Sequence, residues 1–221
     1  MPAEGAPVRI RLWDFPVRVV HWSFAVLVPV LWWTAEEGKL ELHITIGLFM
    51  LGLVLFRLLW GFAGSAQARF STFVRGPGAV LAHIRGRTQS APGHNPLGAL
   101  SVLALLGLLA LQVGLGLFAQ DEDGIDYGPL NHLVSYDRAD SLSEWHGTMF
   151  YVLLGVIVVH LAAIVWYRVV RRDNLITPMI TGYRAVAAGV AAPVMAPLWR
   201  FAASALVAAG VAWWISKGAP L

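Results

Sequence analysis

The stretch that decides the fold is EWHGTMFYVLLGVIVVHLAAIVWY, residues 144–167. It is apolar nearly throughout, yet it contains His146 and His160. Their spacing of fourteen residues is almost four whole helical turns, so both imidazoles leave the same face of a helix. Along the axis they lie about 21 Å apart, within a hydrocarbon core that is about 30 Å thick. Because ionisable groups inside a membrane span mark functional sites, this stretch predicts a helix that presents a nitrogen ligand near each side of a membrane.

Composition places the whole chain in a membrane. Of its 221 residues, 57% are hydrophobic and only 13% are charged, against about 25% charged residues in soluble domains. The sequence has no Cys, which excludes disulfides, cysteine-ligated iron–sulfur clusters and covalent Cys-x-x-Cys-His haem attachment. Any metal chemistry must therefore use histidines and carboxylates.

Five apolar runs predict five membrane spans in an all-α integral membrane protein. The expected fold is a four-helix transmembrane bundle plus a fifth, C-terminal transmembrane helix, with spans at residues 17–35, 42–62, 97–119, 144–167 and 198–215. Residues 120–143 are expected to form a long acidic loop without a readable fold. A loop over 63–96 is expected to carry a short surface helix within 73–86.

The basic residues predict the orientation of the spans. All Lys and Arg except Lys39, Arg138 and Lys217 fall on the side that holds the N-terminus, and all but three of the 13 acidic residues fall on the other side. We therefore expect the N-terminus in the cytoplasm and the C-terminus in the periplasm. The acidic outer loops would steer a basic partner, although such loops also arise simply from the charge bias of membrane topology.

Four histidines pair by their expected depth. His43 and His146 lie near the outer side, whereas His21 and His160 lie near the inner side. This arrangement suits two b-type haems stacked across the membrane, each with two axial imidazoles. A single histidine near the end of a span is more often interfacial or engaged in helix packing, but four that pair by depth favour ligands. The remaining histidines, His83, His94 and His132, are expected in loops.

Two arginines are candidate contacts for haem propionates at the inner level. Arg57 follows His43 by fourteen residues, so it leaves the same face of the second span at inner depth. A buried arginine needs an anionic partner, and a propionate would supply one. Arg18, one turn before His21, is a candidate for a further contact. The alternative for Arg57 is a charge that reaches the membrane interface along its own side chain.

Several motifs resemble a known family. They are RLWDFPVRVVHWSF at 11–24, ELHITIGLFMLGLVLFRLLWGF at 41–62, GHNPLGALS at 93–101, the histidine pair of the fourth span, and NLITPMITGYR at 174–184. Together they resemble the di-haem cytochrome b subunits of nickel–iron hydrogenases and formate dehydrogenases, and are most similar to bacterial cytochrome b561 proteins.

The resemblance covers residues 9–184 and implies a di-haem cytochrome b transmembrane domain. It implies two haem b groups, with His21 paired to His160 and His43 paired to His146, and electron exchange with a quinone. Residues 185–221 would be a linker and an additional transmembrane helix, which departs from the four-helix pattern.

The predicted function is electron transfer across a bacterial inner membrane, between quinone and an outer redox partner. That partner would be a c-type cytochrome or a hydrogenase-like subunit, and we expect contacts with membrane lipid but none with nucleic acid. The alternatives are a superoxide:quinone oxidoreductase of the cytochrome b561 type, a structural anchor subunit of a redox complex, and a transporter with a histidine relay. The transporter predicts buried carboxylates, which the apolar cores of the spans lack.

The quinone is expected near the inner haem, at the start of the third span. Asn95 offers an amide donor there, and His94 offers an imidazole with an ordinary pKa near 6.5. Because Pro96 suits the first turn of a helix, Asn95 is also expected as its N-cap. The cap alone would explain Asn95 without any quinone.

Overall fold

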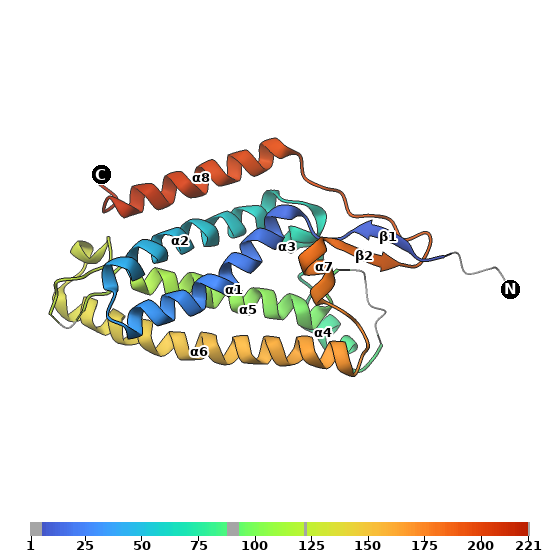
Figure 1. Ribbon diagram of the computed structural model, residues 1–221, viewed down its shortest axis with the longest axis horizontal. Helices are drawn as coiled ribbons and strands as arrows, with labels where there is room; N and C mark the ends of the chain where they lie inside the picture. Colours follow the sequence, from blue (N-terminus) through green and yellow to red (C-terminus); the bar gives the residue numbers. More distant parts are fainter. Residues whose placement is uncertain (1–5, 88–92, 122, 221) are drawn as a thin grey trace.

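Five long helices lie side by side along the long axis of the computed structural model, which describes residues 6–87, 93–121 and 123–220 (Figure 1). All five are long and apolar enough to cross a membrane, so the predicted class, an all-α multi-pass membrane protein, is confirmed. They are α1 (Phe15–Glu36), α2 (Leu40–Ala63), α5 (Pro96–Gly116), α6 (Tyr136–Val169) and α8 (Leu198–Ser216).

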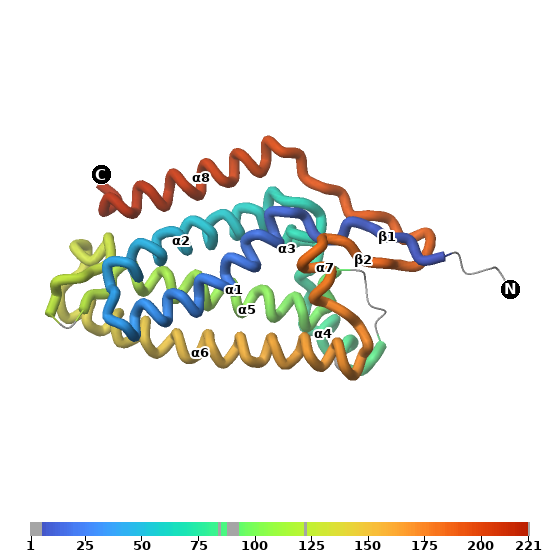
Figure 2. Tube along the Cα trace, in the orientation of Figure 1, coloured from blue at the N-terminus to red at the C-terminus, as the bar shows by residue number. Residues whose placement is uncertain are grey.

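Short elements connect the long helices. The surface helix predicted within 73–86 is α4 (Pro77–Ile84), preceded by η1 (Ala66–Ala68) and α3 (Phe70–Phe73). An antiparallel pair of strands, β1 (Val8–Arg11) and β2 (Tyr183–Val186), was not predicted. It joins the start of the chain to the segment that follows α7 (Ile176–Thr181), and Figure 2 shows the two segments running side by side at one end of the bundle.

Side-chain caps fix where two of the spans begin. Asp14 precedes α1, and its Oδ1 accepts a hydrogen bond of 2.8 Å from the backbone N–H of Val17. Asn95 precedes α5, and its Oδ1 accepts one of 2.7 Å from the N–H of Gly98. Each cap satisfies a backbone donor that has no partner within the helix. The predicted N-cap at Asn95 is thus confirmed.

The start of the fourth span differs from the prediction. Helix α6 begins at Tyr136, eight residues before the predicted start at Glu144. Hydropathy locates only the part of a helix that lies in lipid, and the first two turns of α6 are polar, so the apolar run could not reveal them. The segment 120–135, in which the sequence showed no readable fold, does contain local structure. That segment contains the bridge Gln120↔Tyr127 and η2 (Asn131–Leu133).

The helices pack in the order α1–α2–α5–α6, and α8 covers a further face of α2. Helices α1 and α6 approach each other less closely than these neighbouring pairs do. The centre of the bundle is closed by Met50, Val54, Leu109 and Leu153, which form one buried cluster. The four helices therefore surround a core whose two ends remain lined by histidines.

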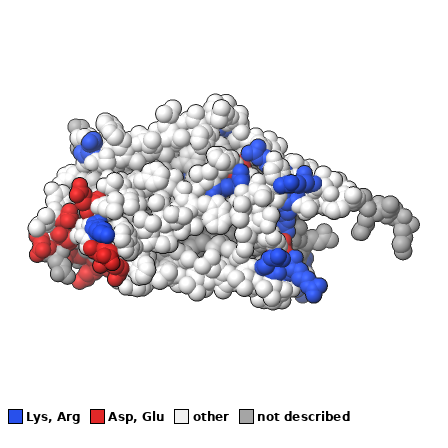
Figure 3. Space-filling model, viewed as in Figure 1, with Lys and Arg blue, Asp and Glu red and all other residues white. Residues whose placement is uncertain are grey.

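Charges divide between the two ends of the bundle (Figure 3). What we call the acidic end consists of the turn 36–41 and the segment 120–144. What we call the basic end consists of β1, the segment 63–96 and the segment 168–200. Acidic side chains gather visibly at the first, and most of the visible Lys and Arg gather at the second. The two sets of loops that were predicted to share a side do lie together.

Candidate functional site: two pairs of histidines

The pair at the acidic end joins α2 to α6. The ring centroids of His43 and His146 are 6.1 Å apart, and the ring planes are nearly perpendicular, at 85°. Nδ1 of His43 lies 2.9 Å from the backbone oxygen of Leu31 in α1, and Nδ1 of His146 lies 2.9 Å from that of Gln112 in α5. Because a carbonyl only accepts, each Nδ1 carries the proton, and each Nε2 keeps its lone pair for a metal.

A cavity of about 200 Å³ adjoins this pair and is lined by residues of all four helices. Gly47 of α2 and Gly147 of α6 border it, and an added Cβ at either would meet no atom within 4 Å. Gly116 of α5 is different, because a Cβ there would lie 2.9 Å from Cε1 of His146. Small residues thus keep space in front of the rings and let α5 approach His146.

The spacing of the two rings fits axial ligands of one metal. Metal–imidazole bonds are about 2 Å long, so two imidazoles on opposite sides of one ion have centroids roughly 6 Å apart. Among the described residues there is no cluster of three or more His, Cys, Asp or Glu that could hold a bare metal ion. Haem needs only two ligands from the protein, because the porphyrin supplies the other four nitrogens.

The pair at the basic end joins α1 to α6. His21 and His160 lie close enough to interact electrostatically. Nδ1 of His160 is 3.0 Å from the hydroxyl oxygen of Ser101 in α5, whereas Nδ1 of His21 is buried without a hydrogen-bond partner among the described residues. The ring of His21 also packs edge-to-face against Trp22, with centroids 5.2 Å apart. The structure thus brings the ring of His43 close to that of His146, and it places His21 within electrostatic range of His160.

Arg57 is buried at the basic end, with 7% of its surface exposed. Its Nη1 donates to the backbone oxygen of Ala68 at 3.4 Å, and its guanidinium lies over the ring of Phe70. The carboxylate that acts on it electrostatically is Asp14, whose Oδ2 accepts 2.9 Å from the indole nitrogen of Trp60. Sequence reasoning missed this buried carboxylate, although an Asp two residues before a proline at a helix start is a recognisable N-cap signal.

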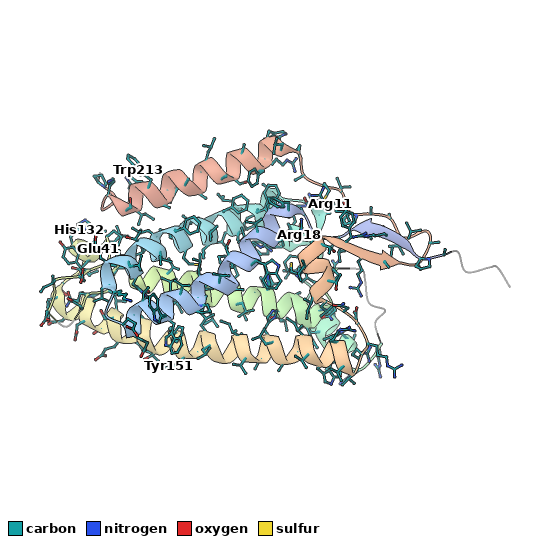
Figure 4. The ribbon with its side chains drawn as sticks, viewed as in Figure 1. Arg11, Arg18, Glu41, His132, Tyr151 and Trp213 are labelled. Carbon is teal, nitrogen blue, oxygen red and sulfur yellow. The ribbon has the colours of Figure 1, made fainter. Side chains whose placement is uncertain are left out.

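Arg18 lies between α1 and α7 (Figure 4). One of its terminal nitrogens donates to the backbone oxygen of Ile180. Its Nε is buried against Gly182 and, in the part of the chain that the structure describes, has no hydrogen-bond partner. The guanidinium carbon lies 5.7 Å from the ring centre of Phe15.

The segment before α5 is held by aromatic and polar contacts. The ring of His94 lies between Trp13 and Phe73, with centroids 4.7 and 4.6 Å away. Burial, and secondly the nearby charge of Arg57, lower the pKa of His94 to about 4, well below the ordinary value on which the sequence interpretation relied. At neutral pH this imidazole is uncharged.

A polar chain continues from Asn95 to α6 and α4. The side-chain amide of Asn95 donates to the hydroxyl of Tyr167 at 2.7 Å. That hydroxyl is also 3.5 Å from Nε2 of His83, which lies in α4, the short helix predicted within the 63–96 connection. His132 lies in η2 at the acidic end.

These features define a membrane-spanning helical bundle that carries paired imidazoles at two depths. The family model described as Prokaryotic cytochrome b561 matches residues 12–182, and the chain belongs to this family. It is accordingly a membrane b-type cytochrome of electron transfer, from a family that binds haem b. Neither the comparison with curated proteins nor that with solved structures found a match. Helix α8 lies beyond the matched residues.

Proposed function

We propose that the protein holds two haem b groups and carries electrons across the membrane between quinone and a redox partner at the acidic end. The outer haem is assigned to His43 and His146, and the inner haem to His21 and His160. The observation that carries this proposal is the outer pair, whose rings are 6.1 Å apart and whose Nδ1 atoms are both held by backbone oxygens.

The protein's contribution is to hold and insulate the two groups. When bound, haem would supply an iron that changes oxidation state, and the imidazoles of the two histidine pairs would hold it. Leu153 is 2% exposed and packs with Met50 and Val54 between the two histidine levels. This apolar layer excludes water from the path between the levels. We assign Arg57 to a propionate of the inner haem, because its charge is buried and, within the described residues, the carboxylate of Asp14 acts on it without forming a salt bridge.

The quinone is proposed to react at the basic end, near the inner pair. The hydroxyl of Tyr167 accepts from the amide of Asn95, so its own proton is left to donate to a quinone carbonyl or to His83. Asn95→Asp keeps the N-cap and removes the amide donor. We expect it to slow quinone reduction while the protein still folds. Unchanged quinone reduction would remove Asn95 from the site.

The orientation follows from the charges of the loops. With the basic end in the cytoplasm of a bacterial cell, the acidic end faces the periplasm, where it suits a basic c-type cytochrome or the basic face of a hydrogenase-like subunit. Superoxide is an anion, and the acidic side chains at this end of the bundle would repel it. The histidine pairs favour electron transfer over a purely structural anchor, because an anchor subunit would have no use for them.

Transfer through the protein is tested in sealed proteoliposomes. We expect a reduced lipid-soluble quinone to transfer electrons to the haem, which the absorbance spectrum would report. An acceptor added on the acidic side should then reoxidise the haem. His146→Ala should block reoxidation by the acceptor while part of the haem is still reduced by quinol. Haem that quinol never reduces, with the wild-type protein fully loaded, would contradict the proposed function.

A further inference from the structure

A second hollow, distinct from the histidine cavity, opens on the lipid-facing surface along α1. It has a volume of about 490 Å³ and is lined mainly by one face of α1, with contributions from α2 and α7. Most of its wall is apolar and strongly exposed, including Phe15, Val26, Phe49 and Ile180. Exposed apolar side chains alone are ordinary in a membrane span, so the hollow is informative only through what lies at its end.

Arg18 is the charged residue in the wall of this groove. It lies near the start of α1, at the basic end, and Figure 4 shows it beside α7. In the part of the chain that the structure describes, no carboxylate lies within salt-bridge distance of it. A guanidinium at the edge of the hydrocarbon core is costly without an anion. The groove therefore combines an apolar trough with a cation at one end.

The length of the groove matches one leaflet of a bilayer. Its α1 residues run from Phe15 to Leu27, which is about 18 Å along a helix axis. Half of a hydrocarbon core is about 15 Å thick. A lipid whose phosphate meets Arg18 would lay one acyl chain past Trp22 and Val26 and would end near the middle of the membrane.

We propose that this groove binds an anionic phospholipid of the cytoplasmic leaflet, with the lipid phosphate on Arg18 and one acyl chain along α1. The groove opens at the end where positive side chains gather (Figure 3), and the cytoplasmic leaflet is the one rich in anionic lipid. Charge selects this occupant over a quinone, because a neutral quinone would leave Arg18 without a counter-charge. None of the four paired histidines lines the groove, although Trp22 in its wall packs against the ring of His21.

Native mass spectrometry of the haem-loaded protein, after exchange with phosphatidylglycerol or phosphatidylcholine, tests the site. The wild type should retain one phosphatidylglycerol molecule and favour it over phosphatidylcholine. Arg18→Gln should lower the retained phosphatidylglycerol by about fivefold, which is the usual effect of one basic residue at a membrane surface. The matched control is Arg168→Gln, at an exposed arginine of the same end, which should change retention little.

A variant that leaves every charge in place separates the groove from general surface charge. Val26→Trp fills the acyl-chain part of the groove and should reduce retention of phosphatidylglycerol, even if Arg18→Gln fails to fold. Equal losses in Arg18→Gln and Arg168→Gln, or full retention in Val26→Trp, would overturn the proposal. So would full retention in Arg18→Gln together with a shifted spectrum of the inner haem, because Arg18 would then be the propionate contact that the sequence suggested.

Discussion

The two histidine pairs differ in what holds their imidazoles. At the acidic end both Nδ1 atoms bond to main-chain oxygens, those of Leu31 and Gln112. At the basic end the Nδ1 of His160 depends on the hydroxyl of Ser101, and the Nδ1 of His21 has no hydrogen-bond partner within residues 6–87, 93–121 and 123–220. A helix backbone cannot rotate away from a ligand, whereas a serine side chain can. The outer pair is therefore preorganised by the fold itself, and the inner pair depends on side chains that mutation can remove.

Removing a ligand should have the largest effect. We expect His43→Ala and His146→Ala to abolish the same component of the reduced-minus-oxidised spectrum and to halve the haem content. His21→Ala and His160→Ala should abolish the other component. If His146→Ala matched His21→Ala instead, the pairing by depth would be wrong.

Removing a hydroxyl beside each histidine pair tests whether the outer imidazoles are held more firmly than the inner ones. Ser101→Ala takes away the sole hydrogen bond at Nδ1 of His160, and loss of such a partner costs about 10- to 100-fold in metal affinity. Thr34→Val is the matched change at the outer pair, because the hydroxyl of Thr34 is 3.2 Å from Nδ1 of His43. There the oxygen of Leu31 remains, so haem retention during dilution should fall much less. Equal losses in both variants would contradict the difference between the pairs.

The basic end should also respond to pH through His94. Its pKa is lowered to about 4, so the folded protein binds a proton at this site more weakly than the unfolded chain does. The stability that neutral His94 contributes is complete above about pH 6.5 and declines as the pH falls toward 4, by at most about 1.4 kcal/mol per pH unit. The thermal stability of His94→Phe should therefore depend less steeply on pH over this range than that of the wild type. An identical slope in wild type and variant would remove His94 as its source.

The smallest expected effect concerns steering at the acidic end. Acidic side chains gather at the end of the bundle that holds the outer pair, and Glu36 lines the cavity beside it. Electron transfer to a basic c-type cytochrome should slow as salt rises, because exposed charges are screened beyond about 8 Å at physiological ionic strength. Reduction of the inner haem by quinol should be nearly independent of salt. Rates at the outer haem that do not change with salt would exclude steering.

Hydropathy predicted the five long apolar helices, and residue spacing assigned four histidines to two depths, because both patterns can be read from single helices. The atoms that hold the imidazoles were not predictable in this way. Two are main-chain oxygens of Leu31 and Gln112, which carry no sequence signal and reach the histidines only after neighbouring helices pack. The strand pair and the polar start of α6 were missed for a related reason. Each depends on contacts between distant segments or on a helix that continues into water.

Quantification of haem per chain tests the central claim most directly. Four imidazoles in two pairs should hold two non-covalent haems, so the pyridine haemochrome assay on purified protein should give two haem b per polypeptide, all extractable by acidified solvent. Because the sequence has no Cys, no haem should remain attached after extraction. A value of one haem per chain, or none, in fully loaded protein would contradict the assignment of the two histidine pairs.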